Sequence, residues 1–321
     1  MPPNRNQIGV LSIKFDALAM RAPHPTDAPP TAQPELDPLA AQRWRGLARA
    51  HSPWLHEEVG QRMAQRLDWL LQTPATWLSW HPALGGWQAQ QAVAARWPQA
   101  RLHLLDEQGR LQPHAASPEP TPASPTATAA PVPPTIAPGQ ADLLWANMAL
   151  HLYAEPQPLL ACWHRWLRPD GLLYFSSLGP DTLRELRPLY AKRGWPPPHQ
   201  SFVDMHDWGD MLVESGFAAP VLDTERIVLC YPSPERLLAD LRAFGRNLHP
   251  QRPASLRGRG HRQRLLAAIE HELPRTPEGQ WSLSFEIIYG HAVRATPRVP
   301  VAASSSVPLE QMRQWLRQGR G

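Results

Sequence analysis

The chain has 321 residues, 42% of them hydrophobic, which is enough for one large domain or two small ones with a packed core. Its formal net charge of +4, from 32 basic and 28 acidic residues, fits many kinds of partner and selects none. Its two cysteines, Cys162 and Cys230, argue against a disulfide framework, and no stretch approaches the roughly 20 apolar residues of a membrane-spanning helix, so we expect a soluble cytoplasmic protein with no membrane partner.

The N-terminal third begins without regular pattern and then alternates between strand and helix. Residues 1–40 show no sustained apolar period, and we expect a flexible arm there. A helix follows, with Ser52 as its N-cap, Pro53 at its first position, and apolar residues at helical spacing from Leu55 to Leu70. The next residues predict a strand at 76–80, a helix at 87–97 and a strand at 101–106.

A proline-rich segment interrupts this alternation. Residues 107–140 carry no apolar period, so they predict a disordered surface insertion. The pattern then resumes with a strand at 141–150, a helix at 156–167, a turn at RPDG and a strand at 172–177. Such alternation favours an α/β fold with a doubly wound, mostly parallel sheet.

The C-terminal half predicts longer strands and more helices. Ser233 suits the N-cap of a helix that follows a strand. We expect helices at 204–217, 233–247 and 262–273, strands at 221–231 and 281–293, and a C-terminal tail at 297–321.

Ligands of such sheets bind beyond the carboxyl ends of the strands, and candidate residues lie at three of these ends. Gly85 and Gly86 follow the first strand and suit either a helix N-terminus that approaches a ligand or a plain tight turn. Asp106, about 20 residues later, is either a ribose ligand or a solvated acid. Trp145 and Asn147 suit either an adenine contact or a core tryptophan with a turn asparagine.

Metal and nucleic-acid sites are not indicated. Cys162 and His164 stand two apart on a predicted helix and therefore point to different faces, which does not suit a shared metal. The basic run at 252–264 lacks interleaved aromatic residues and is more typical of a solvated connection than of a nucleic-acid contact.

From Asp142 onward the sequence resembles the class I S-adenosylmethionine-dependent methyltransferases, and among them the biotin-synthesis malonyl-acyl-carrier-protein O-methyltransferases. RPDG before a strand is shared across the superfamily, whereas SSLGPDTLREL together with FVDMHDWGDML is specific to the subgroup. SPWLHEEVGQRMAQRLDWL is similar to the family's leading helix. The resemblance covers residues 41–295 apart from the insertion.

This resemblance implies a Rossmann-like, doubly wound, mostly parallel seven-stranded sheet with a helical cap, formed by residues 41–296. It implies S-adenosylmethionine as methyl donor and, as acceptor, a malonyl thioester on acyl carrier protein. Ser79 stands where the family has an acid, His81 and Ala83 stand where it has glycines, and the Gly85–Gly86 pair persists.

The resemblance also implies binding roles for residues of the turn and of two further strand ends. Gly85, Gly86, Asp106, Trp145 and Asn147 would bind the cofactor. An acceptor carboxylate would need a cation, for which Arg184 or another arginine of the cap region is a candidate. The arginines of 242–264 could dock the acidic carrier. Two hypotheses remain open: an active methyltransferase, and a catalytically silent relative with a binding or regulatory role.

Overall fold

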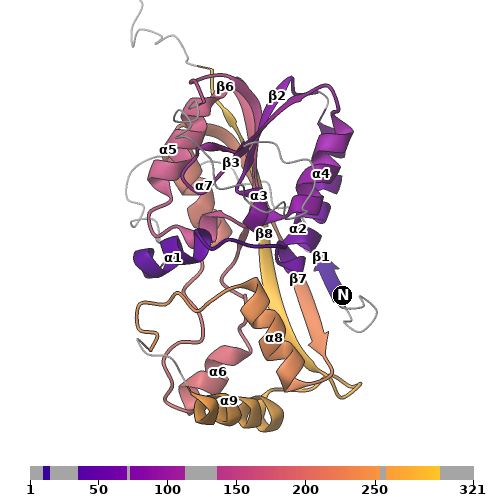
Figure 1. Ribbon diagram of the computed structural model, residues 1–321, viewed down its shortest axis with the longest axis vertical. Helices are drawn as coiled ribbons and strands as arrows, with labels where there is room; N and C mark the ends of the chain where they lie inside the picture. Colours follow the sequence, from indigo (N-terminus) through magenta and orange to yellow (C-terminus); the bar gives the residue numbers. More distant parts are fainter. Residues whose placement is uncertain (1–9, 15–34, 71–72, 113–135, 254–257, 297–321) are drawn as a thin grey trace, which may run out of the picture.

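A mixed sheet of eight strands forms the centre of the protein (Figure 1). The computed structural model describes residues 10–14, 35–70, 73–112, 136–253 and 258–296. From one edge to the other, the strands are β1 (Val10–Lys14), β7 (Phe217–Tyr231), β8 (Trp281–Arg294), β6 (Leu167–Leu178), β5 (Ala141–Ala146), β2 (Thr76–Trp80), β3 (Arg101–Leu105) and β4 (Leu111–Gln112).

The strand directions confirm the expected fold class. Strands β6, β5, β2 and β3 are mutually parallel, whereas β8 runs antiparallel to both of its neighbours, β6 and β7. The sheet has eight strands rather than seven because Val10–Lys14, inside the expected flexible arm, pairs with the edge of β7. Backbone pairing at a sheet edge needs no apolar period in the sequence, so the pattern gave no signal of this strand.

Helices cover both faces of the sheet and form a cap at one end (Figure 1). One face carries α2 (Trp54–Gln65), η2 (Arg66–Trp69) and α4 (Trp87–Arg96), and the other carries α5 (Gln157–Trp166) and α7 (Met205–Glu214). The cap consists of α6 (Leu186–Lys192), α8 (Pro234–Phe244) and α9 (Arg259–Glu272), packed beside the ends of β7 and β8 that extend beyond the parallel strands. The short helices are α1 (Pro38–Arg45), α3 (Pro82–Gly85) and η3 (Leu150–Leu152).

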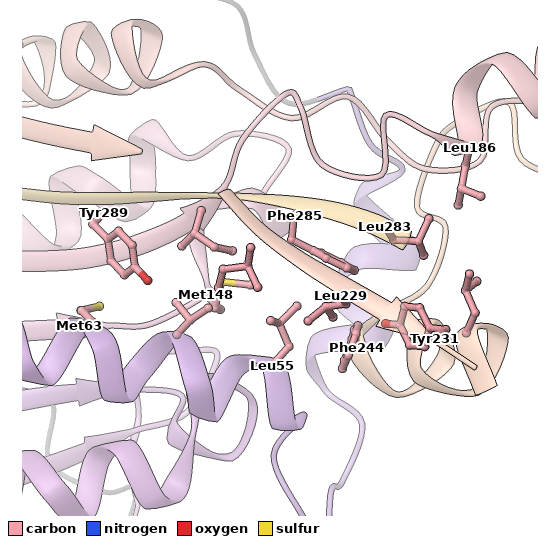
Figure 2. Packing of buried hydrophobic residues seen from close by; sticks show 14 of the residues in the cluster. Leu55, Met63, Met148, Leu186, Leu229, Tyr231, Phe244, Leu283, Phe285 and Tyr289 are labelled. Atoms are coloured by element: carbon pink, nitrogen blue, oxygen red, sulfur yellow. The ribbon is translucent and has the colours of Figure 1, made fainter. Parts of the chain in front are cut away.

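The main hydrophobic core is continuous from the sheet into the cap. Met63 of α2 faces Tyr289 of β8, Leu55 of α2 lies near Leu229 of β7, and Phe244 and Phe285 extend the same cluster toward the cap (Figure 2). A second cluster fills the opposite face beneath α5 and α7. Because one hydrophobic core joins the sheet to the cap, the side chains between them are held in fixed positions by close packing.

Most predicted elements are confirmed within one to four residues at their ends. The RPDG turn lies inside the range of β6, as a bulge between the pairs Ala141–Leu167 and Leu143–Leu172. Most of the predicted insertion, 113–135, and the predicted tail, 297–321, lie outside the described residues. In the described part of the chain, no helix is long and apolar enough to span a bilayer.

Candidate functional site

The turn after β2 leads through α3 into α4. His81 lies in the left-handed region at φ 47°, and Gly86 has φ 127°, a conformation that favours glycine. Ala83 stands inside α3 and is absent from the positive-φ residues, so its Cβ causes no backbone strain. His81 therefore adopts a conformation that usually favours glycine, whereas Ala83 does not.

The glycines of this region allow protein groups to pack closely. A Cβ at Gly85 would lie 2.8 Å from the carbonyl oxygen of Asn147, and a Cβ at Gly86 would lie 2.9 Å from Oε2 of Glu57. Gly60, in the middle of α2, similarly leaves room for Ala89 and for Nδ2 of Asn147. The atoms that lie closest to these three glycines therefore belong to this protein's own side chains and backbone.

The backbone N–H groups at the start of α4 are engaged by α2 and the residues before it. Gln88 N donates to Oε1 of Glu57 at 3.2 Å, and Ala89 N donates to Oε2 at 3.0 Å. Trp87 N donates to Oγ of Ser52 at 3.1 Å. The prediction that Ser52 caps α2 is therefore wrong: Pro53 occupies that position, and the Ser52 hydroxyl instead contacts α4, 35 residues away in sequence.

Asn147 joins β5 to its surroundings. Its Nδ2 donates to the carbonyl of His56 at 2.7 Å and also to the carbonyl of Gly85, while its Oδ1 accepts from Oγ of Ser176 at 2.6 Å. The structure thus brings Asn147 to the Gly85–Gly86 turn, as the sequence suggested, but its side-chain amide is held there by protein groups.

The side chains of the other two predicted cofactor residues contact other parts of the chain. Oδ1 of Asp106 accepts from Gln108 N and Arg110 N, and its Oδ2 accepts from Nε of Arg110 at 2.7 Å, so the carboxylate closes the β3–β4 hairpin. Trp145 is 2% exposed and packs edge-on against Tyr174 in the main core, with ring centroids 5.9 Å apart.

A cavity of about 440 Å³ opens between the carboxyl ends of β5 and β6 and the cap. Its lining includes Met148 after β5 and Leu178 at the end of β6, together with His56 of α2 and Phe285 of β8. Its walls are mainly apolar residues of α6, α8 and the segments between them, and Trp44 of α1 closes one side. A pocket of this size with largely apolar walls suits a small molecule or an acyl chain.

Four arginines line this cavity, all within the basic region singled out by sequence: Arg242, Arg246, Arg252 and Arg262. Arg252 pairs with Asp37 at 2.8 Å, which fixes the start of α1 to the cap. Arg242 and Arg262 are exposed and make no ion pair with an acid in the described ranges.

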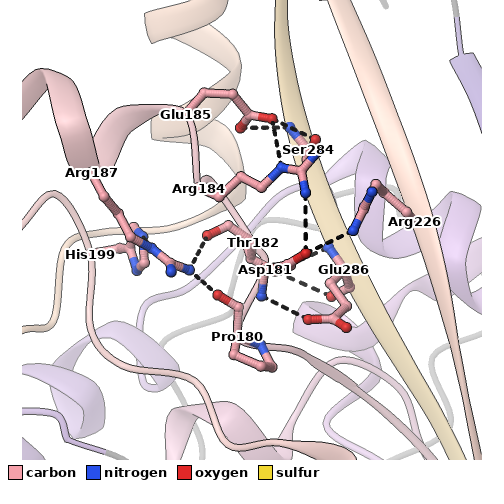
Figure 3. Close-up of polar contacts among 10 residues, drawn as sticks. All are labelled: Pro180, Asp181, Thr182, Arg184, Glu185, Arg187, His199, Arg226, Ser284 and Glu286. Carbon is pink, nitrogen blue, oxygen red and sulfur yellow. Dashed lines mark hydrogen bonds and ion pairs between the residues drawn. The ribbon is translucent and has the colours of Figure 1, made fainter.

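Arg184, the predicted partner of an acceptor carboxylate, lies outside the cavity lining. Its guanidinium is 3.3 Å from Asp181 and 3.6 Å from Glu185 (Figure 3). Asp181 also pairs with Arg226 at 2.7 Å, so this cluster fixes the segment before α6 against β7 and β8. The arginines that line the cavity therefore belong to residues 242–262, and Arg184 is not among them.

Sequence reasoning did not identify three histidines of the cavity, of which His56 and His151 are buried and His199 is half-buried. His56 Nδ1–H donates to the carbonyl of Leu84 at 2.8 Å, and burial lowers the pKa of His56 to about 4. Burial also lowers the pKa of His151 to about 3 and that of His199 to about 4. These imidazoles are therefore neutral at pH 7.

Comparison with known proteins agrees with the fold. A family model described as a methyltransferase domain matches residues 112–175. A malonyl-acyl-carrier-protein O-methyltransferase of Laribacter hongkongensis is 38% identical over 259 residues, which covers 76% of this chain and 84% of the relative. Proteins of the same description from Gallionella capsiferriformans and a Methylovorus species are 35% and 34% identical, each over 76% of this chain and 86% and 84% of their own lengths.

Proposed function

Because the chain belongs to the family of malonyl-acyl-carrier-protein O-methyltransferases, we propose that it transfers a methyl group from S-adenosylmethionine to the free carboxylate of a malonyl thioester on acyl carrier protein, as a step in biotin synthesis. The observation that carries the proposal is the 440 Å³ cavity at the carboxyl ends of the parallel strands, with arginines along its lining. Its position is where ligands of open α/β sheets bind.

The residues present fit the methyl donor on the cavity side of the turn. Met148 and His56 offer an apolar surface and a neutral imidazole there. The N–H groups of Trp87, Gln88 and Ala89 already bind Ser52 and Glu57, so they offer no free anion site in this arrangement. The donor, when bound, supplies an electrophilic methyl group on its sulfonium.

The chain's own part in the reaction is positioning and exclusion of water. A carboxylate acceptor is already ionised at pH 7, so no general base is required. The apolar walls formed by Leu178, Leu241 and Phe285 would desolvate the acceptor beside its donor. Holding both in line in such a cavity is a large source of rate enhancement.

The arginines suit an acidic carrier. Arg242 and Arg262 lie exposed at the cavity, where they would steer an acidic protein that delivers a tethered acyl group. A cytoplasmic location is part of the proposal, supported by the two cysteines, Cys162 and Cys230, which are both free.

The second candidate function is a silent relative that binds the acyl carrier without transferring a methyl group. One observation favours it: the turn that would contact the donor is filled by Glu57 and Asn147.

Intact-mass spectrometry separates the two candidates. Malonyl-acyl carrier protein incubated with the chain and S-adenosylmethionine is expected to gain the mass of one methyl group. Succinyl-acyl carrier protein serves as the control for acceptor length. An unchanged malonyl carrier, under conditions where the carrier is bound, would favour the silent relative.

A further inference from the structure

Glu57 is a buried carboxylate that no cation neutralises. It lies in the first turn of α2 and is 8% exposed. In the part of the chain that the structure describes, it makes no ion pair with arginine, lysine or histidine; its hydrogen-bond donors are Gln88 N and Ala89 N. The charge is therefore held by the first turn of another helix, α4.

The start of α4 suits an anion for two reasons. Its first N–H groups lack partners within the helix, and the helix dipole places partial positive charge there. Each oxygen of Glu57 takes one of these N–H groups, at 3.2 and 3.0 Å. The Glu57 carboxylate and the start of α4 are therefore complementary in charge and geometry.

The surrounding residues are shaped around this carboxylate. Gly86 has φ 127°, and a side chain there would begin 2.9 Å from Oε2 of Glu57. Gly60 lets α2 approach α4 closely enough that a Cβ would lie 2.5 Å from that of Ala89. A ligand carboxylate at the same N–H groups would have to displace Glu57.

We propose that Glu57 is a built-in anion that fills the helix N-terminus at the donor turn, so that the carboxylate of the methyl donor is not recognised there. The inference rests on the proposed function for its ligand. The carboxylate is the one anionic group of S-adenosylmethionine, and it is repelled by Glu57 rather than attracted by the start of α4. Glu57 thereby sets which parts of the donor contribute to affinity.

The first test compares two donors that differ in this carboxylate. Calorimetry of the full chain is expected to give dissociation constants for S-adenosylmethionine and its decarboxylated analogue within about threefold of each other. In Glu57→Ala, the freed N–H groups should favour S-adenosylmethionine over the analogue by about tenfold. Glu58→Ala is the matched control, since Glu58 is the next residue and pairs with Arg62 at 2.9 Å, and it should behave as the parent.

A parent that already prefers the carboxylate-bearing donor tenfold, with that preference lost in Glu57→Ala, would overturn the inference. Glu57→Gln provides a variant of the same shape without the charge, and its preference should fall between those of the parent and Glu57→Ala.

The second test does not depend on donor binding. Replacing Glu57 by Ala removes a group the size of acetate from the start of α4, so sodium acetate should raise the melting temperature of Glu57→Ala more than sodium chloride at equal ionic strength. The parent and Glu58→Ala should respond equally to the two salts. If the parent binds no donor but acetate rescues Glu57→Ala, the proposed function fails, while the anion site that Glu57 fills at the start of α4 stands. If acetate gives no specific rescue, the anion site itself is refuted.

Discussion

Asn147 at the end of β5 and Ser176 in β6 are joined by a hydrogen bond of 2.6 Å from Oγ of Ser176 to Oδ1 of Asn147. The same hydroxyl accepts from Met148 N at 3.0 Å. Both side chains are at most 1% exposed, so no water replaces a lost partner. This pair fixes the strand end on which the turn and the cavity floor depend.

Ser176→Ala is therefore expected to destabilise the fold by about 2–3 kcal/mol, because it leaves two buried polar groups without a partner. Ser177→Ala is the matched control: Ser177 is equally buried, but its hydroxyl contacts only the carbonyl of Leu178. The free energy of unfolding in urea measures both. Equal losses in the two variants would contradict the role assigned to Ser176.

A second prediction concerns the ion pairs that tie α2 to β7. Glu225 is 4% exposed; Arg62 lies 2.5 Å from one oxygen, and the Tyr289 hydroxyl donates to the other at 3.2 Å. Glu225→Ala should lower the free energy of unfolding by about 2–3 kcal/mol. This loss is smaller than that expected for breaking a fully isolated buried pair, because Arg62 keeps Glu58 as a partner. Asp68→Ala, which breaks an exposed pair with Arg96, should cost under about 1 kcal/mol by the same urea measurement.

The order of strands and helices was predictable, since it follows from periodicity and turn residues. The alternation of apolar residues along β5 also carried information about the position of Trp145. This tryptophan shares a sheet face with Leu143, two residues earlier, and both belong to the main core. Alternation along β5 therefore indicated a core tryptophan, and β5 ends one residue later, at Ala146.

Asp106 and Glu57 show what the pattern did not decide. An acidic residue after a strand can bind a ligand or stabilise a turn. Asp106 stabilises a turn because Arg110 and the β3–β4 hairpin supply its hydrogen-bond donors. Glu57 meets its partners about 31 residues away in sequence, through the packing of α2 on α4. Gly60 inside α2 was the available signal, because a glycine in a helix interior often marks a close approach.

Buried histidines predict a loss of stability in acid. Because burial lowers the pKa of His151 to about 3 in the folded state, against about 6.5 when unfolded, protons bind the unfolded chain first as pH falls. Stability is therefore lost between about pH 6.5 and 3, by roughly 2 kcal/mol for this group at pH 5. The urea midpoint measured from pH 7 to 5 should fall less steeply in His151→Gln than in the parent. The exposed His271→Gln should keep the parent's slope, and a parental slope in both variants would refute this assignment.

The arginines at the cavity predict a response that depends on the carrier. Arg242→Gln combined with Arg262→Gln should raise KM for malonyl-acyl carrier protein by roughly fivefold, and more at low salt, because rim charges act mainly on encounter. KM for a small malonyl thioester should change less than about twofold. Arg101→Gln removes an exposed charge at the opposite end of the parallel strands and should change neither constant. Equal effects on both substrates would contradict carrier docking.

We expect this chain to bind a methyl donor although Glu57 and Asn147 occupy the turn after β2. Isothermal titration of S-adenosylmethionine into the full chain tests it most directly. We expect saturable one-site heat with a micromolar-range dissociation constant, and competition by S-adenosylhomocysteine. Heat no greater than that of dilution at millimolar donor would contradict it.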